Sequence, residues 1–215
     1  MVQKSPNAGV SLFDQAAATW DTPLRAELAK GVAGTILHRL PLTAAMAAME
    51  FGCGTGLVTA LLAPHLGRMV ATDSSSGMLT ALDEKITGLG LANVTTRCLD
   101  LTSEPLPDER FQLIVSSMTL HHIADLPPLL RTLHGLLTTG GHIALADLDC
   151  EDGTFHSDHT GVAHLGLDRH ELVAMAQEAG FSELAVTTAH TIHKEGNDGR
   201  EHDYPIFLLT GRRGE

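Results

Sequence analysis

Short apolar runs alternate with segments of helical periodicity along most of the chain. Residues 44–51 are small and hydrophobic, which is the composition of a strand buried on both faces of a parallel sheet. Residues 57–66 then change to helical spacing, and residues 23–40 have the pattern of an amphipathic helix ahead of that first strand. The short apolar pattern recurs at residues 68–73, 93–99, 111–117 and 142–148. This alternation predicts an α/β fold with a mostly parallel sheet.

Three further segments have helical spacing between start and stop signals. Serines precede the first, a capping box opens the third, and glycines follow all three. These predicted helices lie at residues 74–88, 125–137 and 168–180. Two last strands are expected at residues 184–191 and 206–212, joined by a polar loop at residues 193–203. The chain is therefore predicted to end in a strand hairpin.

Three glycines stand where the first predicted strand meets its helix. They are Gly52, Gly54 and Gly56, and Glu50 precedes them at the end of the strand. A loop at this junction must turn sharply, let its backbone approach a ligand and direct the helix N-terminus at that ligand. Side chains would obstruct all three. We therefore predict a cofactor-binding loop here, with an ordinary tight turn as the alternative.

The spacing of the glycines separates two classes of cofactor loop. A dinucleotide-binding loop has the pattern G-x-G-x-x-G, and Leu57 holds the position of its third glycine here. Asp73 ends the next predicted strand, near the roughly 20-residue offset at which a carboxylate accepts hydrogen bonds from ribose hydroxyls. An acidic group at this point also disfavours a 2′-phosphate. The alternative for Asp73 is a surface aspartate that caps the following helix.

The pattern E-x-G-x-G-x-G at residues 50–56 resembles the first motif of class I S-adenosylmethionine-dependent methyltransferases. The resemblance covers about residues 10–212 and implies a Rossmann-like, doubly wound sheet of seven strands. That sheet would be mostly parallel, with an antiparallel last strand and helices on both faces. The positions that it places at S-adenosylmethionine are Trp20, Glu50, Gly52, Cys53, Gly54, Gly56, Asp73, Ser74, Met78, Asp100, Leu101, Ser116 and Ser117.

Several of these positions have an implied role and a simpler alternative. The resemblance implies that Glu50 faces the ammonium end of the cofactor and that Met78 packs against adenine. It also implies that Asp100 accepts a hydrogen bond from the adenine amino group beside the Leu101 amide. A core methionine and an aspartate that caps a turn are the alternatives. Trp20 lies in a segment of pattern F-D-x-x-A-x-x-W-D, which either docks on the core or covers the cofactor cleft.

Composition and charge limit the classes of partner. At 215 residues the chain is long enough for one sizeable α/β domain, and its net charge of −12 opposes attraction to nucleic acid or anionic lipid. Cys53, Cys98 and Cys150 are widely spaced and include no C-x-x-C pair, so a disulfide framework is not expected. With no secretory leader and no apolar run of membrane-spanning length, we expect a cytoplasmic protein without a membrane partner.

The expected methyl acceptor is a small molecule. Residues 116–119 read S-S-M-T and do not match the Asn/Asp-Pro-Pro-aromatic motif of amino methyltransferases that act on bases in nucleic acid. The Pro-Cys pair of cytosine-C5 enzymes and the acidic clamp of arginine methyltransferases are also missing. We therefore expect in-line methyl transfer from S-adenosylmethionine to a small molecule, with S-adenosylhomocysteine as the product and no nucleic-acid partner.

Histidine and acidic residues crowd the loop after the fifth predicted strand. They are Asp149, Glu151, Asp152, His156, Asp158, His159 and His164. Three interpretations stay open: a divalent metal held by histidine and aspartate, an active-site lid with a catalytic or substrate-binding histidine, or a solvated polar loop. We name His159 as the catalytic candidate and assign no metal. His122, after the fourth predicted strand, is a second candidate, with a buried structural histidine as its alternative.

We expect a single domain over residues 1–215, as a monomer or homodimer. Its predicted parts are an N-terminal helical lid segment at 1–43, a cofactor-binding core at 44–148, an active-site loop insertion at 149–168, and a C-terminal helix and hairpin at 169–215. Two other functions stay open. One is a cofactor-binding sensor or subunit without catalysis. The other is an NAD-dependent oxidoreductase, against which Leu57 argues.

Overall fold

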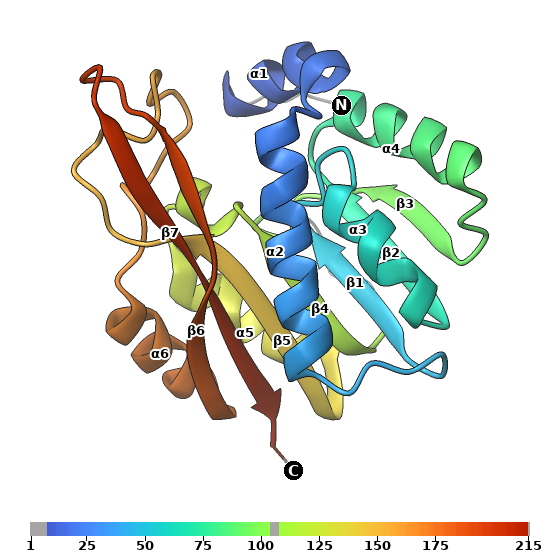
Figure 1. Cartoon of the computed structure of the whole chain (residues 1–215). Coiled ribbons are helices and arrows are strands. Elements are labelled where there is room, and N and C mark those ends of the chain that lie inside the picture. The colour runs from blue at the N-terminus through green and yellow to red at the C-terminus, as the bar shows by residue number, and fades with distance from the viewer. Residues whose placement is uncertain (1–7, 104–107, 215) are drawn as a thin grey trace.

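The computed structural model describes residues 8–103 and 108–214, which form one seven-stranded sheet with helices on both faces (Figure 1). The strands are β1 (Ala47–Phe51), β2 (Arg68–Asp73), β3 (Val94–Cys98), β4 (Phe111–Ser117), β5 (Leu137–Leu148), β6 (Phe181–Glu195) and β7 (Glu201–Arg213). The helices are α1 (Ala8–Ala16), α2 (Pro23–Arg39), α3 (Leu57–Leu62), α4 (Ser76–Leu89), α5 (Leu126–Leu136) and α6 (Arg169–Glu178). Short 3₁₀ turns are η1 (Ala17–Thr19), η2 (Ala63–His65) and η3 (Leu120–His122).

The strand order is β3-β2-β1-β4-β5-β7-β6. Strands β1 to β5 are parallel to one another, whereas β7 is antiparallel to both β5 and β6. This confirms the predicted Rossmann-like sheet with an antiparallel last strand. The chain leaves β1 toward β2 and β3, and then returns to the other side of β1 to form β4. In open α/β sheets, ligands bind at the carboxyl ends of the strands beside such a switch point.

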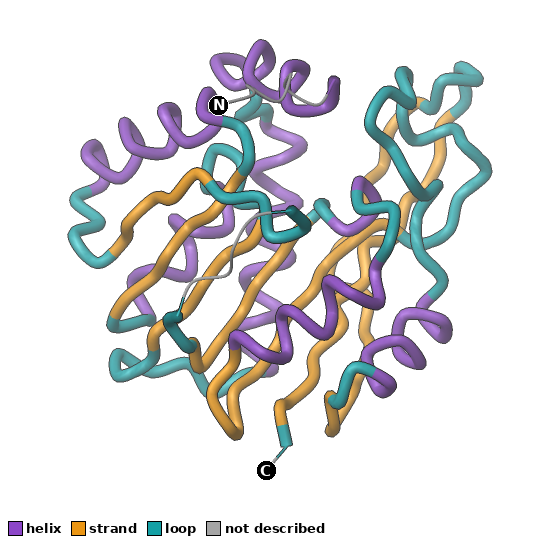
Figure 2. The backbone as a smooth tube through the Cα atoms, turned by 180° about the vertical axis from the view of Figure 1, so that it is seen from behind, coloured by secondary structure: helices purple, strands orange, loops and turns teal. Residues whose placement is uncertain are grey.

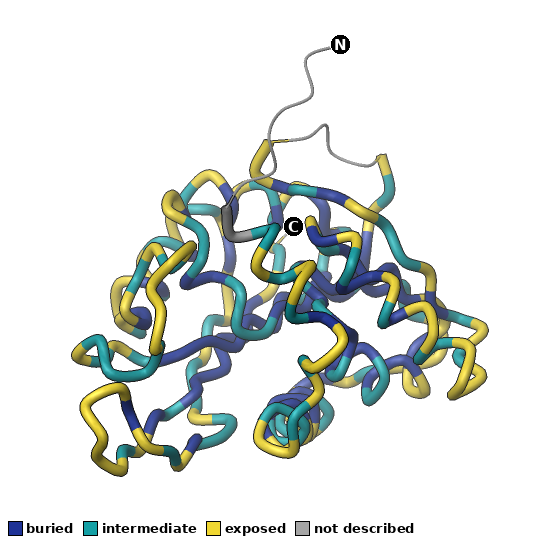
Figure 3. The backbone as a smooth tube through the Cα atoms, turned by 90° about the horizontal axis from the view of Figure 1, so that it is seen from above, coloured by how far each residue is buried: buried dark blue, intermediate teal, exposed yellow. Residues whose placement is uncertain are grey.

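Alternation along the central strands sorts the interior into two hydrophobic cores. Ala48, Leu113 and Ala144 point into the core beneath α2 and α3. Their chain neighbours Met49, Ile114 and Ile143 point to the opposite face, where α5 and α6 pack (Figure 2). Because the side-chain period of a strand is two, each buried strand contributes to both cores. Figure 3 shows the buried segments concentrated in the middle of the molecule, between more exposed outer segments.

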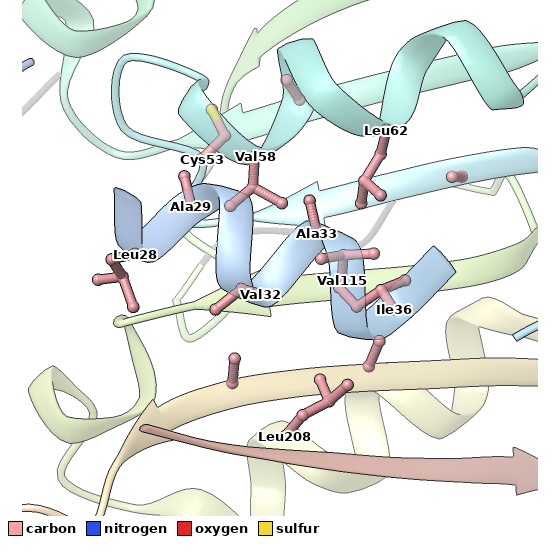
Figure 4. Close-up of a cluster of buried hydrophobic side chains, with 14 of the residues drawn as sticks. Leu28, Ala29, Val32, Ala33, Ile36, Cys53, Val58, Leu62, Val115 and Leu208 are labelled. Atoms are coloured by element: carbon pink, nitrogen blue, oxygen red, sulfur yellow. The ribbon is translucent and has the colours of Figure 1, made fainter. Parts of the chain in front are cut away.

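Helix α2 covers the sheet with a narrow stripe of apolar side chains (Figure 4). The stripe consists of Leu28, Ala29, Val32, Ala33 and Ile36, all buried. Their spacing places them on one face of a helix, and the two alanines let the helix approach Val58 of α3 and the strands closely. Thr22 caps the helix by accepting a hydrogen bond from the backbone of Arg25 at 3.3 Å. The predicted amphipathic helix at residues 23–40 is therefore present, one residue shorter.

Two predicted boundaries are wrong for identifiable reasons. The helix expected at residues 57–66 ends at Leu62, and a 3₁₀ turn that contains Pro64 follows, because proline lacks the N–H that an α-helix needs. Strand β5 begins at Leu137 rather than residue 142 and runs through Gly140 and Gly141. A side chain at Gly141 would lie 3.0–3.2 Å from three backbone carbonyl oxygens, so the glycine permits close backbone approach within the strand.

The prediction of a polar loop at residues 193–203 is also wrong. Strands β6 and β7 stay paired through His193 with Asp203 and Lys194 with His202, and only residues 196–200 form the turn. The hairpin extends beyond the rest of the sheet at the upper left of Figure 1. Its side chains there are mostly polar because much of this ladder faces solvent, so a strand resembles a loop in sequence.

None of the helices in the described part of the chain combines the length and the apolar character that crossing a membrane would require.

Candidate functional site

A cleft with a volume of about 690 Å³ opens at the carboxyl ends of β1, β2 and β4. The glycine loop after β1 forms its floor, and α1 with the start of α2 closes one side. The other side is formed by Ile192 and Lys194 of β6 and by six residues of the loop after β5, which are Phe155, His156, Ser157, Asp158, Thr160 and Val162. The cleft therefore lies at the switch point where the topology places a ligand site.

The glycine loop is shaped by two different requirements. Gly52 and Gly56 have φ of +66° and +74°, and a Cβ would lie 2.3 Å from Thr119 Oγ1 at the first and 2.2 Å from Leu82 at the second. The left-handed backbone together with these close approaches favours glycine at both positions. At Gly54, with φ of +52°, such a Cβ would meet only one heavy atom of the described residues within 4 Å, Trp20 Nε1 at 3.8 Å. The Gly54 backbone faces the open cleft, where a bound ligand can approach.

Asp73 ties the glycine loop to the end of β2. Its Oδ2 accepts a hydrogen bond from the Gly54 backbone N–H at 2.8 Å, and its Oδ1 accepts one from the Ser75 N–H at 2.8 Å. Burial raises the pKa of this carboxyl despite the N–H donors. Asp73 lines the cleft. A nucleoside ribose would meet this carboxylate directly beside the loop.

Glu50 places a second carboxyl at the base of the same cleft. The side chain is buried, and Thr59 Oγ1 donates a hydrogen bond to its Oε2. Burial raises the pKa of Glu50 to about 8, with the negative charge of Asp73 adding to the effect. A ligand cation beside Glu50 would favour its ionised form, because the opposite charge offsets the cost of burial.

The N-terminal segment is fastened over the cleft by two aspartates. Asp14 Oδ1 accepts hydrogen bonds from Ser75 Oγ at 2.6 Å and from the Gly77 N–H at 2.8 Å, at the start of α4. Asp21 Oδ1 accepts one from Thr55 Oγ1 at 2.5 Å, and its Oδ2 pairs with Lys85 Nζ at 2.7 Å. The aspartates of the F-D and W-D pairs therefore hold this segment against the glycine loop and α4.

The aromatic rings of that segment face the cleft. Phe13 and Trp20 both line it, with ring centroids 5.6 Å apart in an edge-to-face arrangement. Arg25, in the first turn of α2, stacks on Trp20 at 3.8 Å and donates to its carbonyl oxygen at 3.0 Å. The segment is therefore docked on α4, and its two aromatic rings border the cleft.

Most of the predicted cofactor residues meet at this cleft. The ten that line it are Trp20, Glu50, Gly52, Cys53, Gly54, Asp73, Ser74, Met78, Asp100 and Ser117. Gly56, Leu101 and Ser116 do not line it. Gly56 caps α3, Leu101 is part of the core beneath α5, and Ser116 Oγ donates to the Phe51 carbonyl at 2.8 Å.

Asp100 and Met78 combine the two roles that their sequence positions left open. Asp100 stabilises a turn, since its Oδ1 accepts from the Thr102 N–H at 2.9 Å and its Oδ2 from Ser103 Oγ at 2.6 Å, yet it also lines the cleft. Met78 is buried in the protein interior and also lines the cleft. Each residue therefore has a structural role and also borders the space where a ligand can bind.

Three imidazoles that line the same cleft lie close together. His121 lies 4.1 Å from His122 and 5.1 Å from His156, measured between ring centroids. His122 Nδ1 lies 2.9 Å from the Gly161 carbonyl oxygen, and its ring packs edge-to-face on Phe13 at 5.3 Å. Burial lowers the pKa of His122, and the neighbouring His121 adds to this. Burial, with His121 and His122 nearby, lowers the pKa of His156 to about 4.

Asp147 of β5 is the hydrogen-bond partner of the His121 ring. Asp147 Oδ1 lies 2.6 Å from His121 Nδ1, and its Oδ2 accepts the Leu120 N–H at 2.7 Å. His121 and Asp147 are only 1% and 0% exposed, respectively. Burial alone would raise the pKa of Asp147, but the His121 imidazole and the backbone donors outweigh it and hold that pKa below its usual range. The other ring nitrogen, His121 Nε2, has no hydrogen-bond partner among the described residues.

His159 is not part of this cluster, contrary to expectation. It is exposed, its Nε2 lies 3.2 Å from the Gly153 carbonyl oxygen, and it does not line the cleft. The neighbouring Thr160 instead points its hydroxyl to Asp158 at 2.8 Å. Within residues 8–103 and 108–214, no group of three or more histidine, cysteine, aspartate or glutamate side chains is arranged to hold a metal ion.

Asp147 and His121 were missed by sequence reasoning, although each left a signal. An aspartate inside an otherwise apolar buried strand needs a hydrogen-bonding partner, and the pair His121-His122 contained that partner. The sequence could not indicate which of the two imidazoles faces Asp147. Met118, with φ of +55°, lies in the left-handed region directly after β4, a conformation that its sequence does not indicate.

Comparisons with known proteins agree with this geometry. A family model described as a methyltransferase domain matches residues 49–145. An uncharacterized methyltransferase of Schizosaccharomyces pombe is 32% identical over 136 residues, which make up 56% of this chain and 48% of that protein. Phosphoethanolamine N-methyltransferase 1 of Arabidopsis thaliana is 28% identical over 153 residues, covering 69% of this chain and 31% of that protein.

A solved structure extends the likeness over nearly the whole chain. The DhpI–SAH complex superposes with a TM-score of 0.76 at 20% identity, covering 98% of this chain and 99% of DhpI. At that identity the similarity concerns the fold. The chain spans about half the length of the first curated relatives it matches, with 48% of each covered.

Proposed function

We infer that this chain, which belongs to the class I S-adenosylmethionine-dependent methyltransferases, transfers the methyl group of S-adenosylmethionine to a small-molecule acceptor by in-line displacement. The observation that carries this proposal is the convergence of the open Gly54 backbone with the Asp73 and Glu50 carboxyls in one cleft. Each group matches one part of the cofactor, and all three lie at the strand ends where such a ligand binds.

The chain's own residues fit the cofactor in three places. Glu50, a buried carboxyl with a pKa raised to about 8, suits the α-ammonium group. Asp73 offers its carboxylate to the ribose hydroxyls beside Gly54, and Met78 with Asp100 borders the space for adenine. The bound cofactor supplies an activated methyl group on a sulfonium, so the protein need only position the acceptor in line with it.

Rate in such a reaction comes mainly from positioning and exclusion of water. Phe13 and Trp20 cover the cleft from the N-terminal segment, and Phe155 with Val162 covers it from the loop after β5. The acceptor would enter between these two walls, opposite the carboxyl groups. The cleft volume of about 690 Å³ is within the range of small-molecule sites. The name of the Arabidopsis relative, a phosphoethanolamine N-methyltransferase, also points to a small acceptor.

Other parts of the proposal rest on the sequence. The net charge of −12 supports an acceptor other than nucleic acid, and the cysteine pattern supports a cytoplasmic location. We propose a monomer or homodimer. A sensor or subunit without catalysis would use the same cofactor residues. An NAD-dependent oxidoreductase is disfavoured because Leu57 occupies the position of the third glycine of a dinucleotide-binding loop. The third glycine of this chain's loop is Gly56, which lies against Leu82.

Product formation tests the activity. The protein is incubated with S-adenosylmethionine and a panel of small phenols, hydroxy acids, primary amines and thiols, and the products are analysed by mass spectrometry. The proposal expects S-adenosylhomocysteine together with one acceptor that has gained a methyl group. A metabolite extract is then tested in the same way. Saturable S-adenosylhomocysteine binding with no methylated acceptor from the panel or from the extract would favour the sensor function instead.

A further inference from the structure

We propose that His121 is the general base of this enzyme, that Asp147 positions it, and that the acceptor is therefore a hydroxyl or a protonated amine that must lose a proton. This inference rests on the proposed methyl transfer and adds the acceptor's chemical class and the residue that receives its proton. It replaces the two histidines expected from sequence. His159 lies outside the cleft, and His122 is held by a carbonyl oxygen rather than a carboxylate.

The orientation of His121 is fixed by its neighbours. Asp147 Oδ1 lies 2.6 Å from Nδ1, so the proton of a neutral imidazole is held on that nitrogen. The His121 carbonyl accepts the backbone N–H groups of Ala163 and His164 at 2.9 and 3.0 Å, which fastens the loop after β5 to the 3₁₀ turn. The ring can neither rotate nor flip without breaking a buried hydrogen bond.

The free nitrogen of that ring is in the right place to receive a proton. His121 lines the cleft, and its Nε2 is buried without a partner among the described residues. A proton on Nε2 would be a buried N–H with no acceptor among those residues, which is costly, so the nitrogen is better suited to accept a proton than to carry one. An acceptor hydroxyl or ammonium that donates to Nε2 would satisfy this atom.

Asp147 is suited to stabilise the charged imidazole that proton transfer creates. Its carboxylate is held ionised in the interior by three backbone donors, the N–H groups of Leu120, His121 and Leu148, at 2.7, 3.3 and 2.7 Å. An ionised carboxylate against Nδ1–H favours the imidazolium form of the ring. Asp147 does not line the cleft, so it acts through His121 as a positioning residue.

Two further imidazoles border the ring of His121. His122 and His156 lie within 5.1 Å of its ring, and both have lowered pKa values, chiefly because of burial. Lys194 of β6 also contributes to the lowered pKa of His156. The charged forms of both neighbouring imidazoles are therefore disfavoured beside the atom that we propose as the base.

The step balances without any further reactant. A protonated amine first passes one proton to Nε2 of His121, whose lone pair forms the new N–H bond, and the N–H bond that breaks leaves its electron pair on the amine nitrogen. A hydroxyl passes its proton to the same atom as its oxygen attacks. The lone pair of the acceptor nitrogen or oxygen then forms the bond to the methyl carbon, while the carbon–sulfur bond breaks and its electron pair stays on sulfur. His121 then returns the proton to solvent when the products leave.

A spectroscopic test needs no known acceptor. Long-range ¹H–¹⁵N correlation spectra of the ¹⁵N-labelled protein in its S-adenosylhomocysteine complex report which ring nitrogen carries the proton. The resonances are assigned by their loss in His121→Gln. Because Asp147 Oδ1 lies 2.6 Å from Nδ1, we expect the ring proton on Nδ1 and the lone pair on Nε2. A proton on Nε2, or an imidazolium ion at neutral pH, would overturn the proposal, because the atom could not then act as a base.

Kinetics on an acceptor from the panel separates a base from a structural histidine. We expect His121→Gln to lower kcat by roughly 10²–10⁴-fold, the usual contribution of a general base, with unchanged affinity for S-adenosylhomocysteine. The acid limb of the pH–kcat profile should be lost with it. The matched control is His134→Gln, because the His134 ring packs on Phe181 away from the cleft. This variant should behave as wild type. An unaltered kcat or acid limb in His121→Gln would contradict the assignment.

Asp147→Asn tests the positioning role. It should mix the two neutral tautomers of His121 in the same spectra and shift the acid limb of the profile, whereas a purely structural role would leave the tautomer unchanged. Because the introduced amide would face backbone N–H donors, the wild-type spectrum remains the decisive measurement if this variant unfolds.

The acceptor class and the underlying function fail in different ways. Turnover of phenols or of primary amines supports the proposed class and identifies its member. Turnover only of thiols, or methylation of a hydroxy acid on its carboxylate rather than on its hydroxyl, would overturn the proposal. Absence of S-adenosylhomocysteine binding would instead refute the methyltransferase function itself, whatever the state of His121.

Discussion

The Oδ2 atom of Asp73 lies 2.8 Å from the backbone nitrogen of Gly54, which joins the end of β2 to the glycine loop after β1. A single carboxylate thus shapes the loop and faces the space proposed for the ribose. Because both tasks use charge-assisted hydrogen bonds, this residue should be sensitive to substitution.

We expect Asp73→Ala to weaken S-adenosylhomocysteine binding by about 1.5–3 kcal/mol, the range for hydrogen bonds to charged groups. Isothermal titration calorimetry measures the change. Glu178→Ala, an exposed carboxylate on α6, is the control and should bind as wild type. Unchanged affinity in Asp73→Ala would remove this residue from the ribose site.

Glu50 should couple cofactor binding to pH. With a pKa of about 8 it is mostly protonated near neutrality, and the cofactor's ammonium group should ionise it on binding. Binding at about pH 7 should therefore release close to one proton, and affinity should rise with pH until it levels off above the pKa of Glu50. Calorimetry in buffers of different ionisation enthalpy measures the proton count. Glu50→Gln should bind more weakly and lose this proton release.

The same carboxyl should make the stability of the ligand-free protein depend on pH. Burial raises the pKa of Glu50 from 4.5 in the unfolded chain to about 8 in the folded protein, so the folded state binds the proton more tightly. The contribution of Glu50 to folding is therefore fully present below pH 4.5 and is lost as the pH rises through about 8. Chemical denaturation across this range should show a steeper loss in wild type than in Glu50→Gln; parallel curves would contradict the raised pKa.

The N-terminal segment that carries Phe13 and Trp20 should contribute to cofactor affinity through Lys85. This side chain pairs with Asp21 at 2.7 Å and donates to the Thr55 carbonyl at 2.7 Å, so it links the segment to the glycine loop. We expect Lys85→Met to weaken S-adenosylhomocysteine binding by about 0.5–1.5 kcal/mol, the net value of one or two hydrogen bonds. Lys30→Met removes an exposed pair with Glu27 on α2 and should have no effect on binding. Equal behaviour of the two variants would show that the segment is not coupled to the loop.

Two glycine substitutions should change stability in opposite directions. At Gly56, positive φ and a Cβ position 2.2 Å from Leu82 predict that alanine destabilises the fold by roughly 1–3 kcal/mol or more. At Gly34, in the interior of α2, a Cβ would meet no atom of the described residues within 4 Å, so alanine should stabilise the fold by about 0.5–1 kcal/mol. Urea denaturation measures both. Destabilisation by Gly34→Ala would mean that the environment of α2 has been misjudged.

The sequence predicted the parallel part of the sheet well because its strands are buried and apolar. Residues 68–73 and 111–117 match β2 and β4 residue for residue, and the glycine loop marks the switch point through its composition alone. Buried parallel strands have few polar positions, so their ends are sharp in sequence. The search for apolar runs did not find the strand residues within 193–203, because this part of the β6–β7 ladder faces solvent and carries polar residues.

The candidate site was predictable on its cofactor side and only partly on its acceptor side. Backbone geometry confines Gly52 and Gly56 to glycine, so the loop leaves a local signal. The imidazole cluster depends instead on contacts between β5 and the turn after β4, with a separation of 26 positions between His121 and Asp147. Local patterns do not encode such a pairing, and the density of histidines after β5 pointed to His159 instead of His156.

The most direct test of the central claim is calorimetric titration of the protein with S-adenosylhomocysteine, with NADH titrated in parallel. The account predicts saturable, one-to-one binding of S-adenosylhomocysteine and no binding of NADH. Binding of NADH alone would contradict it. Failure of S-adenosylhomocysteine to bind would also contradict it, because Glu50, Gly54 and Asp73 would then converge on some other ligand.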